Sequence, residues 1–382
     1  MNFSIKLDNN PTSFDSLKVN TLNSGSIAAS TINSNSFLSP FQFQSIPQNS
    51  ADTTTITGLT GTGKWVGGVL VPNGKIYGIP FDSTSVLIID PVSNTTDTTT
   101  ITGLSGTNKW IGGVLAPNGK IYCIPYNSTS VLIIDPATNI VDTTTIAGLI
   151  GDGKWAGGVL ATNGKIYGIP HNSTSLLIID PTTNTADTTT ITGLTGTNKW
   201  VGGVLAPNGK IYGIPWRNTS VLIIDPISIP NTVDTATISG LDSSNFKWAG
   251  GVLAPNGKIY GIPHSNTTVL IIDPVASTAN TTTITGLTGS GKWYGGVLAP
   301  NGKIYCLPSS STNMLIIDPA TNTIDTTTIT GFSGSSDKWT GGVLAPNSKI
   351  YGIPRDSTSV LQIRTGLPTL PPWMQQAYFN KF

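Results

Sequence analysis

The chain has 382 residues, a formal net charge of +1 at pH 7 and a charged fraction of only 10%. This length ordinarily corresponds to two or three domains, and the near-zero charge gives no basis for binding nucleic acid. No apolar run reaches the roughly 18 residues of a membrane-spanning helix, and the N-terminus lacks the apolar region of a secretory signal. We therefore expect no nucleic-acid partner, no membrane insertion and no classical signal peptide. The acidic residues are all Asp, and Thr, Ser, Asn and Gly fill the polar positions, which favours strands and turns over helices.

Residues 1–50 have a pattern of their own. Apolar side chains recur there at every fifth position, namely Leu17, Leu22, Ile27, Ile32 and Phe37. A period of five fits neither a helix nor a flat strand, and so few copies cannot bury a core without partner chains. We therefore predict a β-rich stem that oligomerises or anchors the protein, with a trimer as the simplest assembly. The alternative is a disordered linker rich in Ser and Asn.

Residues 51–364 consist of seven copies of one sequence unit. Each copy carries one tryptophan of a recurring Lys-Trp pair, and the successive spacings of these tryptophans are 45, 45, 45, 48, 45 and 46 residues. A period near 45 with several short strands per copy is typical of a β-propeller blade. The sequence therefore predicts an all-β fold, a seven-bladed β-propeller.

Each unit divides into four expected strands. In the first copy they are "GGVLVP" (67–72), "KIYGIP" (75–80), "SVLIID" (85–90) and "DTTTITG" (97–103). The Asn-Gly pair between the first two is a strong hairpin signal. The third strand is apolar without alternation, as expected for burial on both faces. The paired glycines of the first strand suit the central axis, where seven backbones converge.

The two ends of the repeat region are complementary. The segment "ADTTTITGL" (51–59) precedes the first tryptophan without a blade of its own, and the last copy lacks its fourth strand after Arg364. We therefore expect 51–59 to pair beside 358–364 and close the ring, giving 28 strands in four-stranded blades and no open blade edge.

The stretch "NGKIYGIPFDSTSVLIIDPVSNTTDTTTITGL" (73–104) resembles the YVTN repeat of surface-layer and related propellers. The resemblance covers about 51–364 and implies the propeller architecture. It leaves function open, because such propellers serve as adhesins, surface proteins and some lactonases. More loosely, the repeats are similar to repeat-propeller surface proteins of large DNA viruses, which implies a virion or cell surface location and other surface or capsid proteins as partners.

One position varies while its neighbours hardly change. The residue after Ile-Pro or Leu-Pro is Phe81, Tyr126, His171, Trp216, His264, Ser309 and Arg355 in the seven copies, and Arg217 follows Trp216. Aromatic, histidine and arginine side chains are frequent in recognition surfaces. The variation predicts a binding rim on the face that we call the top, formed by these loops and by the loops that precede each first strand. The alternative is free drift of solvent-exposed loop tips.

The Lys-Trp pairs form a second candidate ring on the same face. They are Lys64, Trp65, Lys109, Trp110, Lys154, Trp155, Lys199, Trp200, Lys247, Trp248, Lys292, Trp293, Lys338 and Trp339. The tryptophans could stack against sugars, or they could pack between blades and leave only the lysines in solvent. Counting these lysines, the top face has a charge of +4 and the opposite face −5, which favours an acidic glycan as partner.

The sequence contains few residues that could form a catalytic site. The two histidines, His171 and His264, are expected two blades apart on outer loops, and we identify no catalytic residues, metal ligands or cofactor site. The prediction is a non-catalytic structural and recognition protein: a propeller head on a stem, with residues 365–382 as an aromatic docking tail, exposed on an extracellular or virion surface. The alternatives are a soluble glycan-binding lectin, a protein-binding scaffold and, least favoured, a propeller lactonase or lyase.

Overall fold

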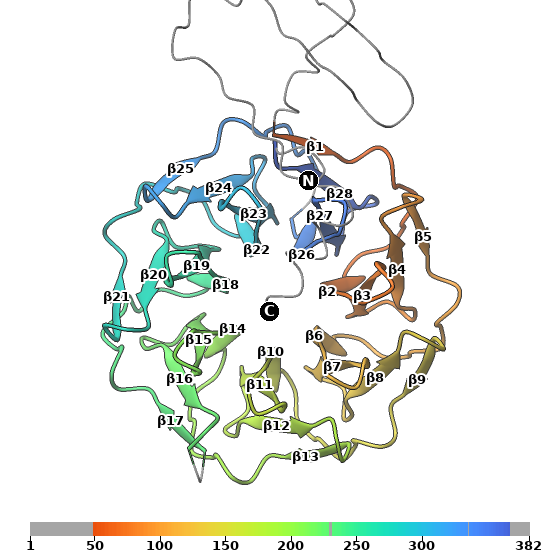
Figure 1. Ribbon diagram of the computed structural model, residues 1–382, viewed down its shortest axis with the longest axis horizontal. Helices are drawn as coiled ribbons and strands as arrows, with labels where there is room; N and C mark the ends of the chain where they lie inside the picture. Colours follow the sequence, from red (N-terminus) through yellow and green to blue (C-terminus); the bar gives the residue numbers. More distant parts are fainter. Residues whose placement is uncertain (1–48, 229–230, 335, 367–382) are drawn as a thin grey trace, which may run out of the picture. The chain divides into compact units, whose positions relative to one another are not determined.

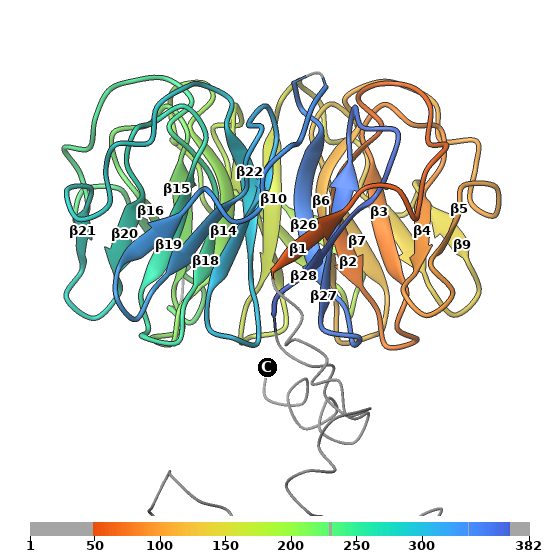
Figure 2. The same ribbon diagram turned by 90° about the horizontal axis from the view of Figure 1, so that it is seen from above.

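The computed structural model describes residues 49–228, 231–334 and 336–366. The five apolar residues of the predicted stem and the predicted C-terminal docking tail lie outside these ranges, so their roles stay predictions, apart from residues 365 and 366 at the start of the tail. Within the described ranges there are 28 strands and no helix, and hence no helix that could span a membrane. The strands form seven four-stranded sheets arranged in a ring, seen along its axis in Figure 1 and at right angles in Figure 2. The predicted seven-bladed propeller is confirmed.

Each blade runs from an innermost strand at the axis to an outermost strand at the periphery (Figure 1). The innermost strands are β2 (Trp65–Leu70), β6 (Trp110–Leu115), β10 (Trp155–Leu160), β14 (Trp200–Leu205), β18 (Trp248–Leu253), β22 (Trp293–Leu298) and β26 (Trp339–Leu344). The second strands are β3 (Ile76–Pro80), β7 (Ile121–Pro125), β11 (Ile166–Pro170), β15 (Ile211–Pro215), β19 (Ile259–Pro263), β23 (Ile304–Pro308) and β27 (Lys349–Pro354).

The outer half of each blade is shorter. The third strands are β4 (Leu87–Asp90), β8 (Leu132–Asp135), β12 (Leu177–Asp180), β16 (Leu222–Asp225), β20 (Leu270–Asp273), β24 (Leu315–Asp318) and β28 (Leu361–Arg364). The outermost strands are β5 (Thr95–Asp97), β9 (Ile140–Asp142), β13 (Thr185–Asp187), β17 (Thr232–Asp234), β21 (Thr278–Asn280), β25 (Thr323–Asp325) and β1 (Ser50–Asp52).

The ring closes as the sequence predicts, although with a shorter strand. β1 pairs antiparallel with β28, in the register Ser50 opposite Arg364 and Asp52 opposite Gln362. The last blade therefore takes three strands from the C-terminal end of the repeats and one from the N-terminal end, in the order β1-β28-β27-β26. This arrangement leaves no blade without an outer strand.

The predicted bounds of the outermost strands are wrong: in the first blade the strand is Thr95–Asp97 and shares only its final aspartate with the predicted segment 97–103. The Asp97 carboxylate accepts hydrogen bonds from the backbone N–H groups of Thr99 (2.7 Å) and Thr100 (3.0 Å), so these groups turn away from the ladder. The chain then returns along the blade and buries Ile101, whose carbonyl accepts a hydrogen bond from Val86 N (3.1 Å). The β-branched threonines suggested a longer strand, but the aspartate side chain ends it.

The hairpin between the first two strands forms at Asn73-Gly74, but not with both residues in the left-handed region. Only Gly74 has a positive φ (81°), and its N–H donates to the Val71 carbonyl at 2.9 Å. In the seventh blade Ser348 takes the glycine position with φ 61°, where a side chain is disfavoured.

A ring of glycines surrounds the axis. A Cβ atom placed on Gly67, whose φ is +79°, would lie 3.1 Å from the Gly112 Cα of the next blade, and the same approach repeats around the ring until Gly341 meets Gly67 at 3.1 Å. No side chain fits between backbones this close. The predicted reason for the glycine pairs is therefore confirmed for the first glycine of each pair.

Neighbouring blades share their hydrophobic core. One cluster joins Tyr77, Ile79 and Ile88 of the first blade to Leu132 and Ile134 of the second, all 0–5% exposed. The third strands are buried on both faces, which explains their unbroken apolar sequence. Burying each such side chain contributes about 1.5–3 kcal/mol, so the packing between blades is a major source of stability.

Candidate binding site at the top of the central channel

Two loops of each blade are bonded together on the top face. In the first blade, Phe81 N donates to the Lys64 carbonyl (2.9 Å) and Asp82 N donates to the Gly63 carbonyl (2.9 Å). The next blade joins them through Lys109 N, which donates to the Phe81 carbonyl (2.9 Å). The residue after Ile-Pro is therefore held between two blades and is not a free loop tip.

These loops surround a hollow at the top of the channel, which we call the top hollow. It has a volume of about 300 Å³ and is lined by Val66, Phe81, Asn108, Ile111, Tyr126, Ala156, His171, Asn198, Val201, Trp216, Phe246, Tyr294, Thr340 and Arg355. All seven blades contribute to this lining. Five of the predicted rim residues, Phe81, Tyr126, His171, Trp216 and Arg355, thus line one central site.

The aromatic rings of the top hollow form two contacting groups. Tyr126 lies between Phe81 and His171, with ring centroids at 6.0 and 5.4 Å. Trp216 lies 5.2 Å from Phe246 and 4.6 Å from His264. His264 does not line the hollow itself, but it supports the tryptophan that does. Phe81 and His171 are 6% and 4% exposed, so the premise of the drift alternative, solvent-exposed tips, does not hold for them.

Both histidines lie around the channel mouth, which corrects their expected position on outer loops. Burial lowers the pKa of His171 and of His264 to about 4. Nδ1 of His171 lies 3.3 Å from the Gly153 carbonyl. Both imidazoles are therefore neutral at pH 7 and can donate and accept hydrogen bonds without adding charge.

Two aromatic residues of the hollow, Phe246 and Tyr294, were not among the binding residues predicted from the sequence. Tyr294 follows the tryptophan of β22, at a position that holds Val66, Ile111, Ala156, Val201, Ala249 and Thr340 in the other blades. Its ring lies 6.4 Å from Trp216 and 6.2 Å from His264. In the same blade the residue after Leu-Pro is the small Ser309. Variation at this second position was visible in the repeats and would have identified it.

The two arginines occupy different places. Arg355 lines the hollow, and its Nη1 pairs with Asp337 Oδ2 at 2.8 Å while its guanidinium lies 5.4 Å from the Phe81 ring centre. Arg217 is not among the lining residues, and its guanidinium lies 4.5 Å from the ring centre of the lining residue Phe246. Both contacts are cation–π interactions.

The Lys-Trp ring is a packing element. Each tryptophan is at most 3% exposed, and Trp65 Nε1 donates to the Ser85 carbonyl at 2.8 Å. The lysines are also buried, contrary to the expectation that they reach solvent: Lys109 Nζ donates to the carbonyls of Gly106 (2.8 Å) and of Phe81 in the preceding blade (3.0 Å). Burial lowers the pKa of Lys199 to about 8. The +4 surplus assigned to the top face counted these lysines, so it is not displayed to solvent.

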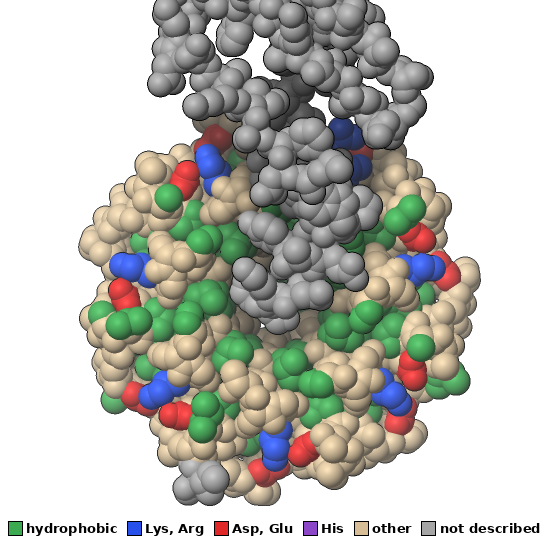
Figure 3. Space-filling model, viewed as in Figure 1, with side chains coloured by type: hydrophobic (Ala, Val, Ile, Leu, Met, Phe, Trp, Pro, Cys, Tyr) green, Lys and Arg blue, Asp and Glu red, His purple; other side chains and the backbone are tan. Residues whose placement is uncertain are grey.

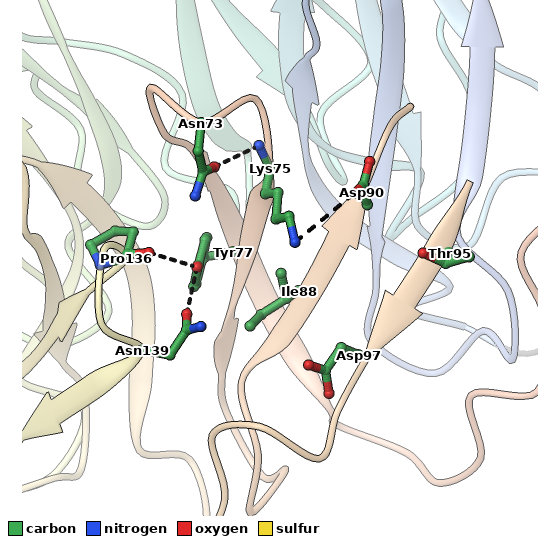
Figure 4. A pocket seen from close by; sticks show the side chains of 9 residues that line it. All are labelled: Asn73, Lys75, Tyr77, Ile88, Asp90, Thr95, Asp97, Pro136 and Asn139. Carbon is green, nitrogen blue, oxygen red and sulfur yellow. Dashed lines mark hydrogen bonds and ion pairs between the residues drawn. The ribbon is translucent and has the colours of Figure 1, made fainter. Parts of the chain in front are cut away.

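The opposite face carries charges that pair with one another. Six Lys–Asp pairs, from Lys75–Asp90 at 3.9 Å to Lys303–Asp318 at 3.5 Å, surround its margin, where Figure 3 shows basic and acidic side chains side by side. Figure 4 shows a small pocket between two blades there, about 130 Å³ in volume, in which Tyr77 donates to Asn139 Oδ1 at 2.7 Å. Its polar groups largely satisfy each other, so the top hollow is the better candidate site.

No cluster of three or more potential metal ligands occurs within the described ranges. The top hollow offers aromatic faces, two neutral histidines nearby and one guanidinium. That set can stack on a flat ring and donate hydrogen bonds to an oxygen-rich ligand.

The comparisons with known proteins support the fold. A family described as "Repeat of unknown function (DUF6923)" matches residues 68–219, and no curated protein matches the sequence significantly. Among solved structures, a streptogramin B lyase is similar with a TM-score of 0.65 and 9% identity, over 84% of this chain and 99% of the lyase. Virginiamycin B lyase from Staphylococcus aureus, in a catalytically inactive histidine-to-alanine variant with quinupristin, gives a TM-score of 0.67 and 10% identity over 83% and 99% of the two chains.

A third similar structure is the extracellular domain of a putative hybrid two-component system from B. thetaiotaomicron, with a TM-score of 0.58 and 10% identity over 81% of this chain and 40% of that one. Likeness at this identity shows the fold alone. The comparisons give no support to the resemblance to viral proteins.

The lyases correct one expectation. We had predicted a non-catalytic protein, partly because the two histidines were expected two blades apart on outer loops. The fold is shared with a lyase, and His171 lines the top hollow while His264 lies beside it. The prediction of a non-catalytic protein is therefore wrong. At 9% identity the likeness does not establish an enzymatic activity either.

Proposed function

We propose that this propeller recognises a glycan in the top hollow and is displayed outside the cell or on a particle surface. The observation that carries the proposal is that Phe81, Tyr126, His171, Trp216 and Arg355, which differ between otherwise similar repeats, line one hollow. Residues that differ between blades make the hollow asymmetric, so it suits one ligand in one orientation.

The chemistry of the lining supports a sugar. Aromatic rings present flat apolar faces that match the C–H faces of a sugar ring, while neutral histidine and asparagine side chains pair with hydroxyl groups. Asn108 and Asn198 supply such amides in the lining. A volume of about 300 Å³ lies at the lower end of small-molecule sites, which fits a monosaccharide unit at the end of a glycan.

The second part of the proposal concerns location, namely display on a surface outside the cell. It is supported by similar folds described as extracellular domains of bacterial sensor systems. Attachment to other surface proteins and assembly through residues 1–50 remain parts of the same proposal.

The test combines Tyr126→Ala with Trp216→Ala and measures binding on a glycan array. We expect the affinity for any bound glycan to fall at least about tenfold, which corresponds to roughly 1.4 kcal/mol. Ile150→Ala is the matched control, because Ile150 is an exposed apolar residue (84%) that does not line the top hollow. Unchanged binding in the double variant would make the varying residues neutral with respect to recognition.

A further inference from the structure

We infer that the ligand of the top hollow carries a carboxylate and that Arg355 binds it, so that the recognised glycan is an acidic one. The inference rests on the proposed function and specifies its ligand. Arg355 stands where the other blades have an aromatic residue, a histidine or a serine, and it is the one charged side chain among the described residues that line the hollow.

The guanidinium of Arg355 is held in place on one side. Its Nη1 binds Asp337 Oδ2 at 2.8 Å, and the other oxygen of that carboxylate accepts a hydrogen bond from Ser309 Oγ at 2.9 Å. Because both carboxylate oxygens are engaged, Asp337 fixes the orientation of the guanidinium plane. The arginine side chain is 28% exposed, so it remains accessible from the hollow.

The other edge of the same guanidinium has unused hydrogen-bonding capacity. Nε of Arg355 is shielded from solvent and has no hydrogen-bond partner within the described ranges. Nε and Nη2 together form the side-on pair of N–H groups that can donate to both oxygens of a carboxylate. A ligand carboxylate that displaces the side chains covering this edge would bind both donors and satisfy the one that is otherwise left unpaired.

The charges around the hollow favour an anion over a cation. No acidic residue lines it within the described ranges, and the nearby histidines are neutral at pH 7. Two of its rings, Phe81 and Phe246, already have an arginine within cation–π distance. Asp337 balances the charge of Arg355, but the arginine and not the aspartate is among the described lining residues. A cationic ligand would therefore meet a guanidinium and rings whose faces are engaged, whereas an acidic sugar would meet N–H donors and free aromatic surface.

The test compares two sugars that differ only at C6. Isothermal titration calorimetry of the full chain with methyl β-D-glucuronide and with methyl β-D-glucoside should give at least tenfold tighter binding of the glucuronide. Arg355→Gln should remove this difference, so that the glucuronide and the glucoside bind with similar affinity. Arg355→Lys, which retains the charge but not the pair of N–H groups, should also lose most of the difference. Arg217→Gln is the matched control: it removes the same charge beside the hollow but not within its lining, and it should retain the preference.

The other possible results contradict the acidic ligand, the role of Arg355 or the glycan proposal itself. Equal affinity for the two sugars in the unmodified protein overturns the inference and leaves the glycan proposal standing, and this comparison does not depend on any variant folding. A preference that survives Arg355→Gln, or that falls equally in Arg217→Gln, shows general electrostatic attraction and overturns the role of Arg355. Absence of binding to both sugars contradicts the glycan proposal, and the inference falls with it.

Discussion

Two neighbouring positions on the top face follow opposite rules. The Lys-Trp pair is the same in all seven blades, while the residue after Ile-Pro is almost always different, although Phe81 N bonds directly to the Lys64 carbonyl. The pair contacts only the backbone and core of its own and the adjacent blade, an environment that recurs seven times. Five of the seven varying residues line the top hollow, to which all blades contribute. The Lys-Trp pair is constant because it packs between blades, whereas the residue after Ile-Pro varies because the blades together form one shared site.

The largest effect should come from removing the contact that joins the last blade to the first. A chain that starts at Gly61 lacks β1 and the buried Ile56 and Leu59. We expect it to lose several kcal/mol of unfolding free energy, about 3–5 or more against a typical total of roughly 5–15. Chemical denaturation measures this loss. A chain that starts at Asn49 retains the strand and should unfold like the parent, and equal stability of all three chains would contradict closure by β1.

A smaller effect should separate the two kinds of position directly. Trp200→Ala removes a tryptophan that is 1% exposed and should cost about 3–5 kcal/mol while ligand affinity is retained. Trp216→Ala removes a half-buried tryptophan that lines the hollow and should cost about 1–2 kcal/mol while affinity falls. Denaturation curves and binding isotherms of the two variants test this. If Trp200→Ala weakened binding more than stability, the packing role of the Lys-Trp ring would be wrong.

The smallest effect should appear in acid, at the outer edge of the blades. The hydrogen bond from Thr100, opposed by partial burial and assisted by backbone donors, lowers the pKa of Asp97 to about 2. A lowered folded-state pKa contributes stability above the unfolded value near 4, and this contribution is lost as the pH falls towards 2. The melting temperature should therefore fall between pH 4 and pH 2.

Asp97→Asn provides the control for this acid effect. Asn280 occupies the same position in another blade and accepts the same backbone hydrogen bonds, from Thr282 N at 2.9 Å and Thr283 N at 3.0 Å. The variant should therefore fold normally and show a smaller fall in melting temperature between pH 4 and 2. An unchanged fall would remove Asp97 from the explanation.

The fold could be predicted because its causes are local and repeated. The spacing of the tryptophans, the glycines at the axis and the unpaired segment before Trp65 each impose one geometry. The extent of the outermost strands could not be predicted from threonine content, because the hydrogen bonds of Asp97 to Thr99 and Thr100 compete with the ladder.

The candidate site could be predicted in its residues but not in its shape. Variation between repeats identified Phe81, Tyr126 and Trp216, yet their convergence depends on loops of neighbouring blades that bond to each other. The same contacts bury the lysines: Lys199 Nζ reaches the His171 carbonyl of the preceding blade at 3.0 Å. Contacts between blades are not visible within one repeat. The predictions that the lysines reach solvent and that the histidines lie on outer loops were therefore wrong.

The pairing of β1 with β28 also determines how the ring responds to force. Ser50 lies opposite Arg364, so the two chain ends leave the ring at the same end of a three-residue ladder. Tension applied between residues 49 and 366 therefore loads these pairs one after another, beginning with Ser50 and Arg364, and does not load them all at once. If the propeller were held through residues 1–48 and pulled through a ligand in the top hollow, the load would pass through this ladder. The last blade should then be the first to open.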